Sequence, residues 1–336
     1  MSATEARSVL ILYEGQGNGG DFGRSFAAGL RAHGCEVLLH PRSADWDGAP
    51  DLVLAYGPFG AAGSMLPVAR HLQRRGARRP RFIWWLTEGV PALWLPRWSV
   101  VLLGRARVWL DQAIPSHNGQ VWARGHRLRI CGELRRLQAQ GVLDVLAVTS
   151  ALRAAYLRRA GFEPVVVPLG YDADTYGCDL GVERDIDVCF VGKVDSRRRR
   201  VLLERVGAQL AKRGTRLTIA TDLYGEARTR FLNRSKIMLN ILRAPHDFVG
   251  QRLMLGAANQ ALVVSEPMLD TGPFVDGKHL VISPLATLAE TIEYYLAHDS
   301  ERSAIAMEAY RFVRTHLTIE QMIGKLLSVP PQGNSN

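Results

Sequence analysis

Short apolar runs alternate with amphipathic stretches along most of the chain, and this alternation is the feature that most constrains its fold. The runs SVLILY at 8–13, DLVLAY at 51–56 and RFIWWL at 81–86 are typical of buried parallel strands. Glycines or polar residues follow each run, and a stretch with helical periodicity follows these. Strands that alternate with helices predict an α/β protein whose parallel sheets are covered by helices.

The alternation is interrupted once, at GYDADTYG (Gly170–Gly177), and then restarts. A chain of 336 residues is long enough for two domains of ordinary size. We therefore predict two Rossmann-like domains, 1–170 and 171–330, with two C-terminal helices that close the chain and a disordered tail at 331–336. Within the first domain, the stretch from Ala106 is interpreted as a loop that leads to a helix at about 132–140.

Glycines follow the first predicted strand in the pattern G-x-G-x-x-G, which can bind a dinucleotide when it stands between a strand and a helix. The pattern is formed by Gly15, Gly17 and Gly20, with Gly19 beside them. The acidic residue expected after the second strand is absent, and Arg42 in its place would suit a 2′-phosphate. The loop is interpreted mainly as one that shapes a cleft between the domains, with NADP binding as the alternative.

Candidate general bases in the first half are few. Glu88 follows the strand at 81–86, at the edge of a parallel sheet where ligands bind. Asp21 and His117 are weaker candidates for the same role, which is to take a proton from an acceptor hydroxyl. A solvated loop or a helix cap explains Glu88 equally well.

Tryptophans crowd the stretch 82–103, at Trp84, Trp85, Trp94 and Trp98. Packing in the core is the commonest role of such side chains. A stacking surface for a sugar or an aromatic acceptor is the second interpretation. Peripheral contact with a membrane, in which nearby arginines meet lipid head groups, is the third.

The second half contains two helix starts that are suited to anions. The stretch 240–267, NILRAPHDFVGQRLMLGAANQALVVSEP, predicts a strand end, a polar loop, a helix that carries Arg252 near its start, and a further strand. Upstream, DVCFVGKVDSRRRRVLLERV places Gly192, Lys193 and the arginines 197–200 at a corresponding position. Free backbone N–H groups and cations at helix starts bind anions, and two such starts suggest a diphosphate.

These stretches, together with LYGEARTRFLNRSKIMLNI and FVDGKHLVISPLATLAETIEYYLAHDSERSAIA, resemble the C-terminal domain of GT-B glycosyltransferases. The resemblance is greatest to the CgeB-like group and to the glycosyltransferase group 1 enzymes. It covers the chain from about Asp185 to its end. It implies two Rossmann-like domains that face a cleft, with a nucleotide sugar held by the C-terminal domain and the acceptor by the N-terminal one.

The resemblance also implies roles for individual residues. Gly192 and Lys193 match the glycine turn and cation near the donor phosphates, Arg252 matches the arginine under the diphosphate, and an arginine such as Arg197 or Arg198 is expected to assist. Tyr224 and Gly225 match the segment near the nucleoside.

Two positions depart from the family pattern. Leu255 stands where an acidic residue commonly bonds the donor ribose, and Gln260 replaces a glycine. Asp247 and Glu266 are candidates to replace the missing carboxylate. The donor's identity therefore remains open.

The expected activity is hexosyl transfer from a nucleotide-diphosphate sugar, such as a UDP-sugar, to a hydroxyl group of a small molecule or glycan. Cations and helix starts can stabilise the departing phosphate, so neither a metal nor a cofactor is expected. The net charge of +10 and the sequence pI of about 9.8 leave a basic nucleic-acid-binding protein as an alternative, although nucleic acid is disfavoured as a partner. Four cysteines without a CxxC pair, and no evident signal peptide, favour a cytoplasmic protein.

Overall fold

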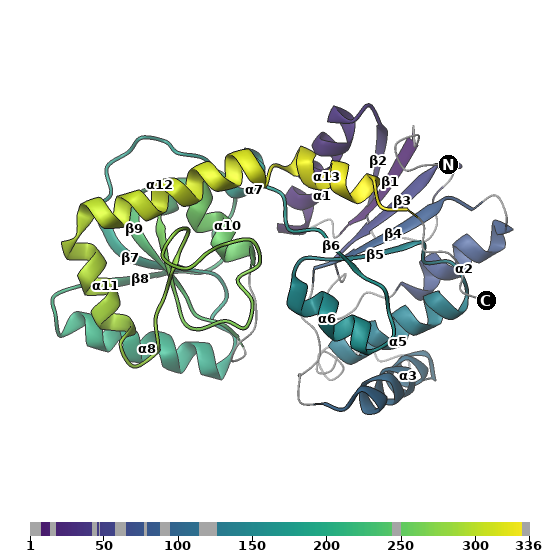
Figure 1. Ribbon diagram of the computed structural model, residues 1–336, viewed down its shortest axis with the longest axis horizontal. Helices are drawn as coiled ribbons and strands as arrows, with labels where there is room; N and C mark the ends of the chain where they lie inside the picture. The colour runs from purple at the N-terminus through teal and green to yellow at the C-terminus, as the bar shows by residue number, and fades with distance from the viewer. Residues whose placement is uncertain are drawn as a thin grey trace. The chain divides into compact units, whose positions relative to one another are not determined.

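The computed structural model describes residues 8–13, 18–41, 46, 48–57, 65–76, 79–87, 95–113, 126–243 and 250–330. The chain divides into two compact units. The first contains the described residues up to Pro168 and from Met322 onward, and the second is Leu169–Gln321. Each unit holds one parallel sheet with helices packed on it (Figure 1). The α/β class predicted from the alternation is confirmed.

The first unit contains a six-stranded sheet in the order β2-β1-β3-β4-β5-β6, in which all pairs are parallel. Its strands are β1 (Ser8–Tyr13), β2 (Glu36–Pro41), β3 (Leu52–Tyr56), β4 (Arg81–Leu86), β5 (Val145–Val148) and β6 (Val165–Val166). Its helices are α1 (Asn18–Ala32), α2 (Leu66–Arg74), α3 (Arg97–Ala113), α5 (His126–Ala139) and α6 (Ala151–Arg159), together with most of α13 (Ile319–Leu327).

Side chains on the two faces of this sheet form separate layers. Leu10 and Trp84 point into a core that includes apolar residues of α2, α5 and α6. On the other face, Phe26 of α1 packs against Tyr56 and Trp85, with ring centroids 4.6 and 4.9 Å apart. The indoles of Trp84 and Trp85 are buried, and each donates a hydrogen bond to a backbone carbonyl. The interpretation that these two tryptophans pack in the core is confirmed.

The loop predicted from Ala106 is wrong, because α3 continues to Ala113 and α5 begins at His126. These two helices pack against each other at a pair of glycines. A Cβ atom on Gly132 would lie 2.2 Å from the carbonyl oxygen of Gly104, so the two backbones approach more closely than any side chain permits. Glycine is unfavourable in a helix, and tertiary packing outweighs this preference here.

Replacing Gly132 by alanine is expected to separate α3 from α5. The methyl group would overlap the backbone of Gly104, so we expect a loss of about 2–3 kcal/mol of stability despite alanine's better helix propensity. Hydrogen exchange should accelerate selectively in α3 and α5. Gly207→Ala in α8 (Arg197–Ala211) is the matched control, because its new methyl group would meet nothing closer than 3.6 Å. Equal melting temperatures for both variants would contradict this account.

The second unit contains a five-stranded sheet in the order β11-β10-β9-β7-β8, again with parallel pairs. Its strands are β7 (Ile186–Val191), β8 (Leu217–Ala220), β9 (Ser235–Asn240), β10 (Leu262–Ser265) and β11 (Val281–Ile282). Its helices are α7 (Ala173–Tyr176), α8, α9 (Gly225–Asn233), α10 (Gly250–Ala258), α11 (Leu288–Ala297) and α12 (Asp299–His316). Helices α8 and α11 pack together, as do α10 and α12.

The chain enters and leaves the second unit through two adjacent segments. Tyr171 forms an isolated parallel bridge with Thr318; its N–H donates to Leu317 O and its carbonyl accepts from Ile319 N, at 2.5 and 2.8 Å. After this point α13 runs back along the first unit, where Arg81 donates to the carbonyl of Val329. Residues 322–330 thus belong to the first unit, whereas the prediction placed them in the second domain. The tail predicted at 331–336 lies outside the described residues.

Candidate functional site

The second sheet has a point where its connections change direction, between β7 and β9. The chain passes from β7 to β8 on one side, and from β9 to β10 on the other. The helices that follow β7 and β9 leave over opposite faces, as α8 and α10 do in Figure 1. In open α/β sheets ligands bind outside the carboxyl ends of strands at such a point. Both helix starts singled out in the sequence lie there.

The segment after β7 turns sharply into α8. Gly192 has a φ angle of 131°, in a region that side chains strongly disfavour, and its N–H donates to the carbonyl of Ala220 at 3.0 Å. Ser196 then caps α8, and its hydroxyl accepts from the N–H of Arg199 at 3.2 Å. Lys193 and Arg197 are exposed at this turn.

Two buried arginines meet at one carbonyl group at the end of β9. Arg252 and Arg199 are 8% and 2% exposed. Arg252 donates from one nitrogen to Asn240 Oδ1 at 2.8 Å and to Ile241 O at 2.7 Å, while Arg199 Nε donates to the same carbonyl at 3.0 Å. Both guanidinium groups also lie over the ring of Phe190, with Cζ 5.3 and 5.5 Å from its centroid. The two predicted anion-binding segments are therefore joined in one cluster.

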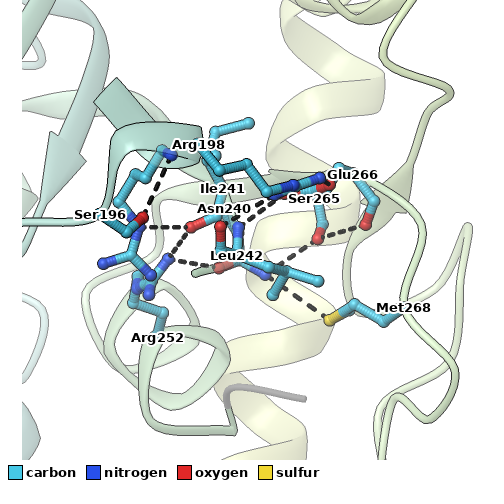
Figure 2. A network of polar contacts seen from close by, with 10 residues as sticks. Ser196, Arg198, Asn240, Ile241, Leu242, Arg252, Ser265, Glu266 and Met268 are labelled. Carbon is cyan, nitrogen blue, oxygen red and sulfur yellow. Dashed lines mark hydrogen bonds and ion pairs between the residues drawn. The ribbon is translucent and has the colours of Figure 1, made fainter. Parts of the chain in front are cut away.

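Glu266, which follows β10, is the buried carboxylate of this cluster (Figure 2). It forms a two-pronged ion pair with Arg198, and its Oε1 also accepts from the N–H of Leu242 at 2.6 Å. Arg198 donates in addition to Leu242 O at 2.9 Å. Both oxygens of the predicted replacement carboxylate thus already accept hydrogen bonds from the protein.

Asn240 connects the arginines to the next strand. Its side-chain amide donates to the Ser265 hydroxyl at 2.9 Å, while its oxygen accepts from Arg252. Ser265 in turn donates to the carbonyl of Glu266 at 2.8 Å. This chain of contacts fixes Arg252 by hydrogen bonds to neighbouring strands, which is the rigid support that a binding residue needs.

Several arginines gather around the end of β9. Arg198 pairs with Glu266, Arg199 and Arg252 both donate to the carbonyl of Ile241, and Arg243 pairs with Asp195. Burial, together with the nearby positive charge of Arg243, lowers the pKa of Arg199 to about 10. A bound anion would favour the charged form of Arg199 and so act against this shift.

Of the other predicted donor-binding residues, two lie at the start of α9 and one lies outside the described part of the chain. Tyr224 and Gly225 begin α9 after β8, where Gly225 has a φ angle of 54° and Tyr224 is 40% exposed. Asp247 lies outside the described residues.

The two departures from the family pattern have a structural account. Gln260 has a φ angle of 52°, in the left-handed region that favours glycine, so the backbone turn is retained although the glycine is not. Its side-chain amide donates to Asp179 at 2.7 Å, which stabilises the turn. Leu255 is buried, at 5% exposure, as are its neighbours throughout residues 252–258 of α10.

Most predicted site residues of the first unit fall outside the described residues: Gly15, Gly17, Glu88 and His117. Gly19, Gly20 and Asp21 lie in the first turn of α1. The predicted roles of all seven residues stay predictions.

A polar cluster that sequence reasoning missed lies at the carboxyl edge of the first sheet. Arg153, close to the start of α6, donates to the carbonyl of Thr87 at 2.8 Å and to the hydroxyl of Thr149. Tyr56 hydrogen bonds to Thr87, and burial raises the pKa of its phenol above the usual value. Three of these residues end or directly follow a strand, which is the sequence signal that identifies this edge.

Comparisons with known proteins show which sequences and folds this chain is similar to. Residues 197–328 match the family model described as glycosyl transferase-like. No curated protein matches. The structure of HepE from Anabaena in complex with UDP-glucose is similar over 96% of this chain and 99% of its own, with a TM-score of 0.55 and 13% identity.

Two further solved structures extend the likeness. A glycosyltransferase from Rickettsia africae matches with a TM-score of 0.60 at 10% identity, over 96% of this chain and 97% of its own. Sucrose-phosphate synthase from Thermosynechococcus elongatus matches with 0.58 at 13%, over 95% and 98%. The chain has the GT-B fold. The predicted resemblance to GT-B glycosyltransferases is confirmed, and it extends to both units.

Within the described residues, no group of three or more His, Cys, Asp or Glu side chains is arranged to hold a metal ion. Within the same part of the chain, no helix combines the length and the apolar character needed to cross a membrane.

Proposed function

We propose that this protein transfers a sugar from a nucleotide-diphosphate donor to an acceptor hydroxyl, and that the donor diphosphate binds at the carboxyl edge of the second sheet between β7 and β9. The observation that carries the proposal is that Arg199 and Arg252, from the two helix starts, meet at the carbonyl of Ile241 where the connections of the sheet change direction. Burying guanidinium groups is costly, and an anionic ligand offsets part of that cost.

The nature of the donor is supported by the comparisons. Structures of HepE in complex with UDP and with UDP-glucose are among those similar to this chain. A uridine diphosphate carries negative charge, and guanidinium groups bind phosphate oxygens well. Tyr224 and Gly225, at the start of α9, are proposed to lie near the nucleoside.

The chemistry needs charge stabilisation where the leaving group departs. The bond between the anomeric carbon and the diphosphate oxygen breaks, a bond to the acceptor oxygen forms, and the acceptor proton passes to a base. Arg252 and the exposed Lys193 would stabilise the negative charge on the departing diphosphate, in the role that a metal ion plays in other enzymes. Glu88, Asp21 and His117 remain the proposed candidates for the base, and the first unit the proposed acceptor-binding unit.

The order of the described strands in the first unit favours the glycosyltransferase over the NADP-dependent reductase. Dinucleotide-binding domains commonly have the order 3-2-1-4-5-6, whereas here β3 lies beside β1 on the side away from β2. In the sequence, the glycine pattern at 15–20 thus follows β1 of a sheet with a different strand order.

A ligand screen by thermal shift tests the proposal against its alternatives. UDP, GDP, dTDP, ADP, NADPH and an oligonucleotide would each be added in excess, since a ligand raises the melting temperature only when it binds the folded state. We expect the melting temperature to rise with a nucleoside diphosphate. When the corresponding nucleotide sugar and an acceptor are both present, we expect release of that nucleoside diphosphate. A rise with NADPH alone, or with the oligonucleotide alone and steeply lost in salt, would overturn the proposal.

A further inference from the structure

Helix α3 carries a stripe of exposed residues on its outer face: Trp98, Leu102, Arg105 and Trp109. Their spacing of four, three and four residues places all of them on one side of a helix. The two tryptophans are 71% and 65% exposed, and Leu102 is 59% exposed. Monomeric proteins seldom place two aromatic side chains so openly on one helix face.

The opposite face of α3 is already occupied. Val100 and Val108 are buried, and Gly104 lies against Gly132 of α5. Figure 1 shows α5 between α3 and the strands of the first sheet. The close glycine contact fixes the rotation of α3 about its axis, so its apolar stripe is held toward solvent by the packing itself.

Charge in and around the stripe is positive. Arg105 is exposed within it, and Arg107 lies beside it, partly buried. The sequence of α3 contains three arginines and one acidic residue, Asp111, and the whole chain has a net charge of +10. A second copy of the chain would be repelled by this charge, whereas an anionic surface would be attracted.

Tryptophan and arginine together are suited to the boundary between lipid head groups and acyl chains. An indole places an apolar ring in that boundary with its N–H toward water, and a guanidinium binds lipid phosphate. The stripe extends along about 16 Å of helix, at 1.5 Å for each residue. We propose that α3 docks the protein in the plane of an anionic phospholipid bilayer, with Trp98, Leu102 and Trp109 inserted and Arg105 bound to phosphates.

Sedimentation with vesicles tests this proposal, which goes beyond glycosyl transfer and does not depend on it. Vesicles of phosphatidylcholine with one quarter phosphatidylglycerol are compared with vesicles of phosphatidylcholine alone. We expect binding to the anionic vesicles, weakened at least about tenfold by W98A/W109A or L102D and about fivefold by R105E. Acyl-chain bromination should quench tryptophan fluorescence in the wild type, and the quenching should be smaller in W98A/W109A.

Matched controls separate docking from general effects. Leu38 in the edge strand β2 is 55% exposed, much like Leu102, so L38D should bind vesicles as the wild type does. Arg205 is exposed on α8 in the second unit, so R205E controls for net charge. A retained thermal shift with nucleotide, or an unchanged melting profile, would show that each variant is folded.

Three results would overturn the proposal. The first is the absence of binding to anionic vesicles by the wild type. The second is equal weakening by L38D and L102D. The third is a dimer in the absence of lipid that W98A/W109A abolishes, which would assign the stripe to contact between copies.

Discussion

Replacing Arg252 by alanine is expected to weaken binding of the nucleoside diphosphate at least about 100-fold, and to remove most of its effect on the melting temperature. Arg252 is held by Asn240 and by the carbonyl of Ile241 at the carboxyl edge of the sheet. Its charge is therefore positioned before the ligand arrives, and no reorganisation is needed on binding. Titration calorimetry with UDP measures the loss directly.

Two companion variants show whether the effect belongs to the site. Arg252→Lys keeps the charge but loses the planar, two-pronged geometry, so we expect binding between that of the wild type and that of the alanine variant. Arg234→Ala removes an arginine from an exposed ion pair with Asp185 and should bind UDP normally. Normal affinity in Arg252→Ala would show that the diphosphate binds elsewhere.

Replacing Glu266 by alanine is expected to destabilise the second unit by about 3 kcal/mol, because Arg198 and the N–H of Leu242 would lose a buried partner. Glu266 is 2% exposed, while the side chain of Arg198 is 25% exposed, so water compensates only in part. The melting temperature of that unit should fall by about 6–12 °C.

An exposed pair of the same type is the control for this prediction. Glu226 and Arg230 form an ion pair on α9 in which both side chains are more than two thirds exposed, so Glu226→Ala should cost less than about 0.5 kcal/mol. Calorimetry of both variants with and without UDP separates stability from binding. Equal melting temperatures for the two alanine variants would show that the buried ion pair does not hold together the segments that follow β9 and β10.

Local sequence patterns were sufficient for most strands. β1 and β4 begin and end at the predicted residues because their apolar runs are continuous and bounded by polar residues or proline. α3 and the beginning of α5 were missed for a physical reason. Gly104 and Gly132 interrupt the helical pattern, and the exposed Trp98 and Trp109 blur its apolar period, so these helices depend on contact with each other.

The candidate site shows a similar division. Lys193 and Arg252 were singled out because helix starts after strands can be recognised locally. The pairing of Arg198 with Glu266, 68 residues away, depends on strand order, which no local pattern contains. The same holds for Arg153 and Thr87, which meet only because β4 and β5 are neighbours in the sheet.

The second unit is an insertion within the first, and Tyr171 and Thr318 form a bridge close to its two ends. Because its two ends are hydrogen-bonded neighbours, this unit could be excised, or the chain reconnected around it, without stretching either cut end. Such an arrangement allows the whole second unit to be exchanged between related proteins, while the remainder of the chain keeps its own C-terminal helix α13.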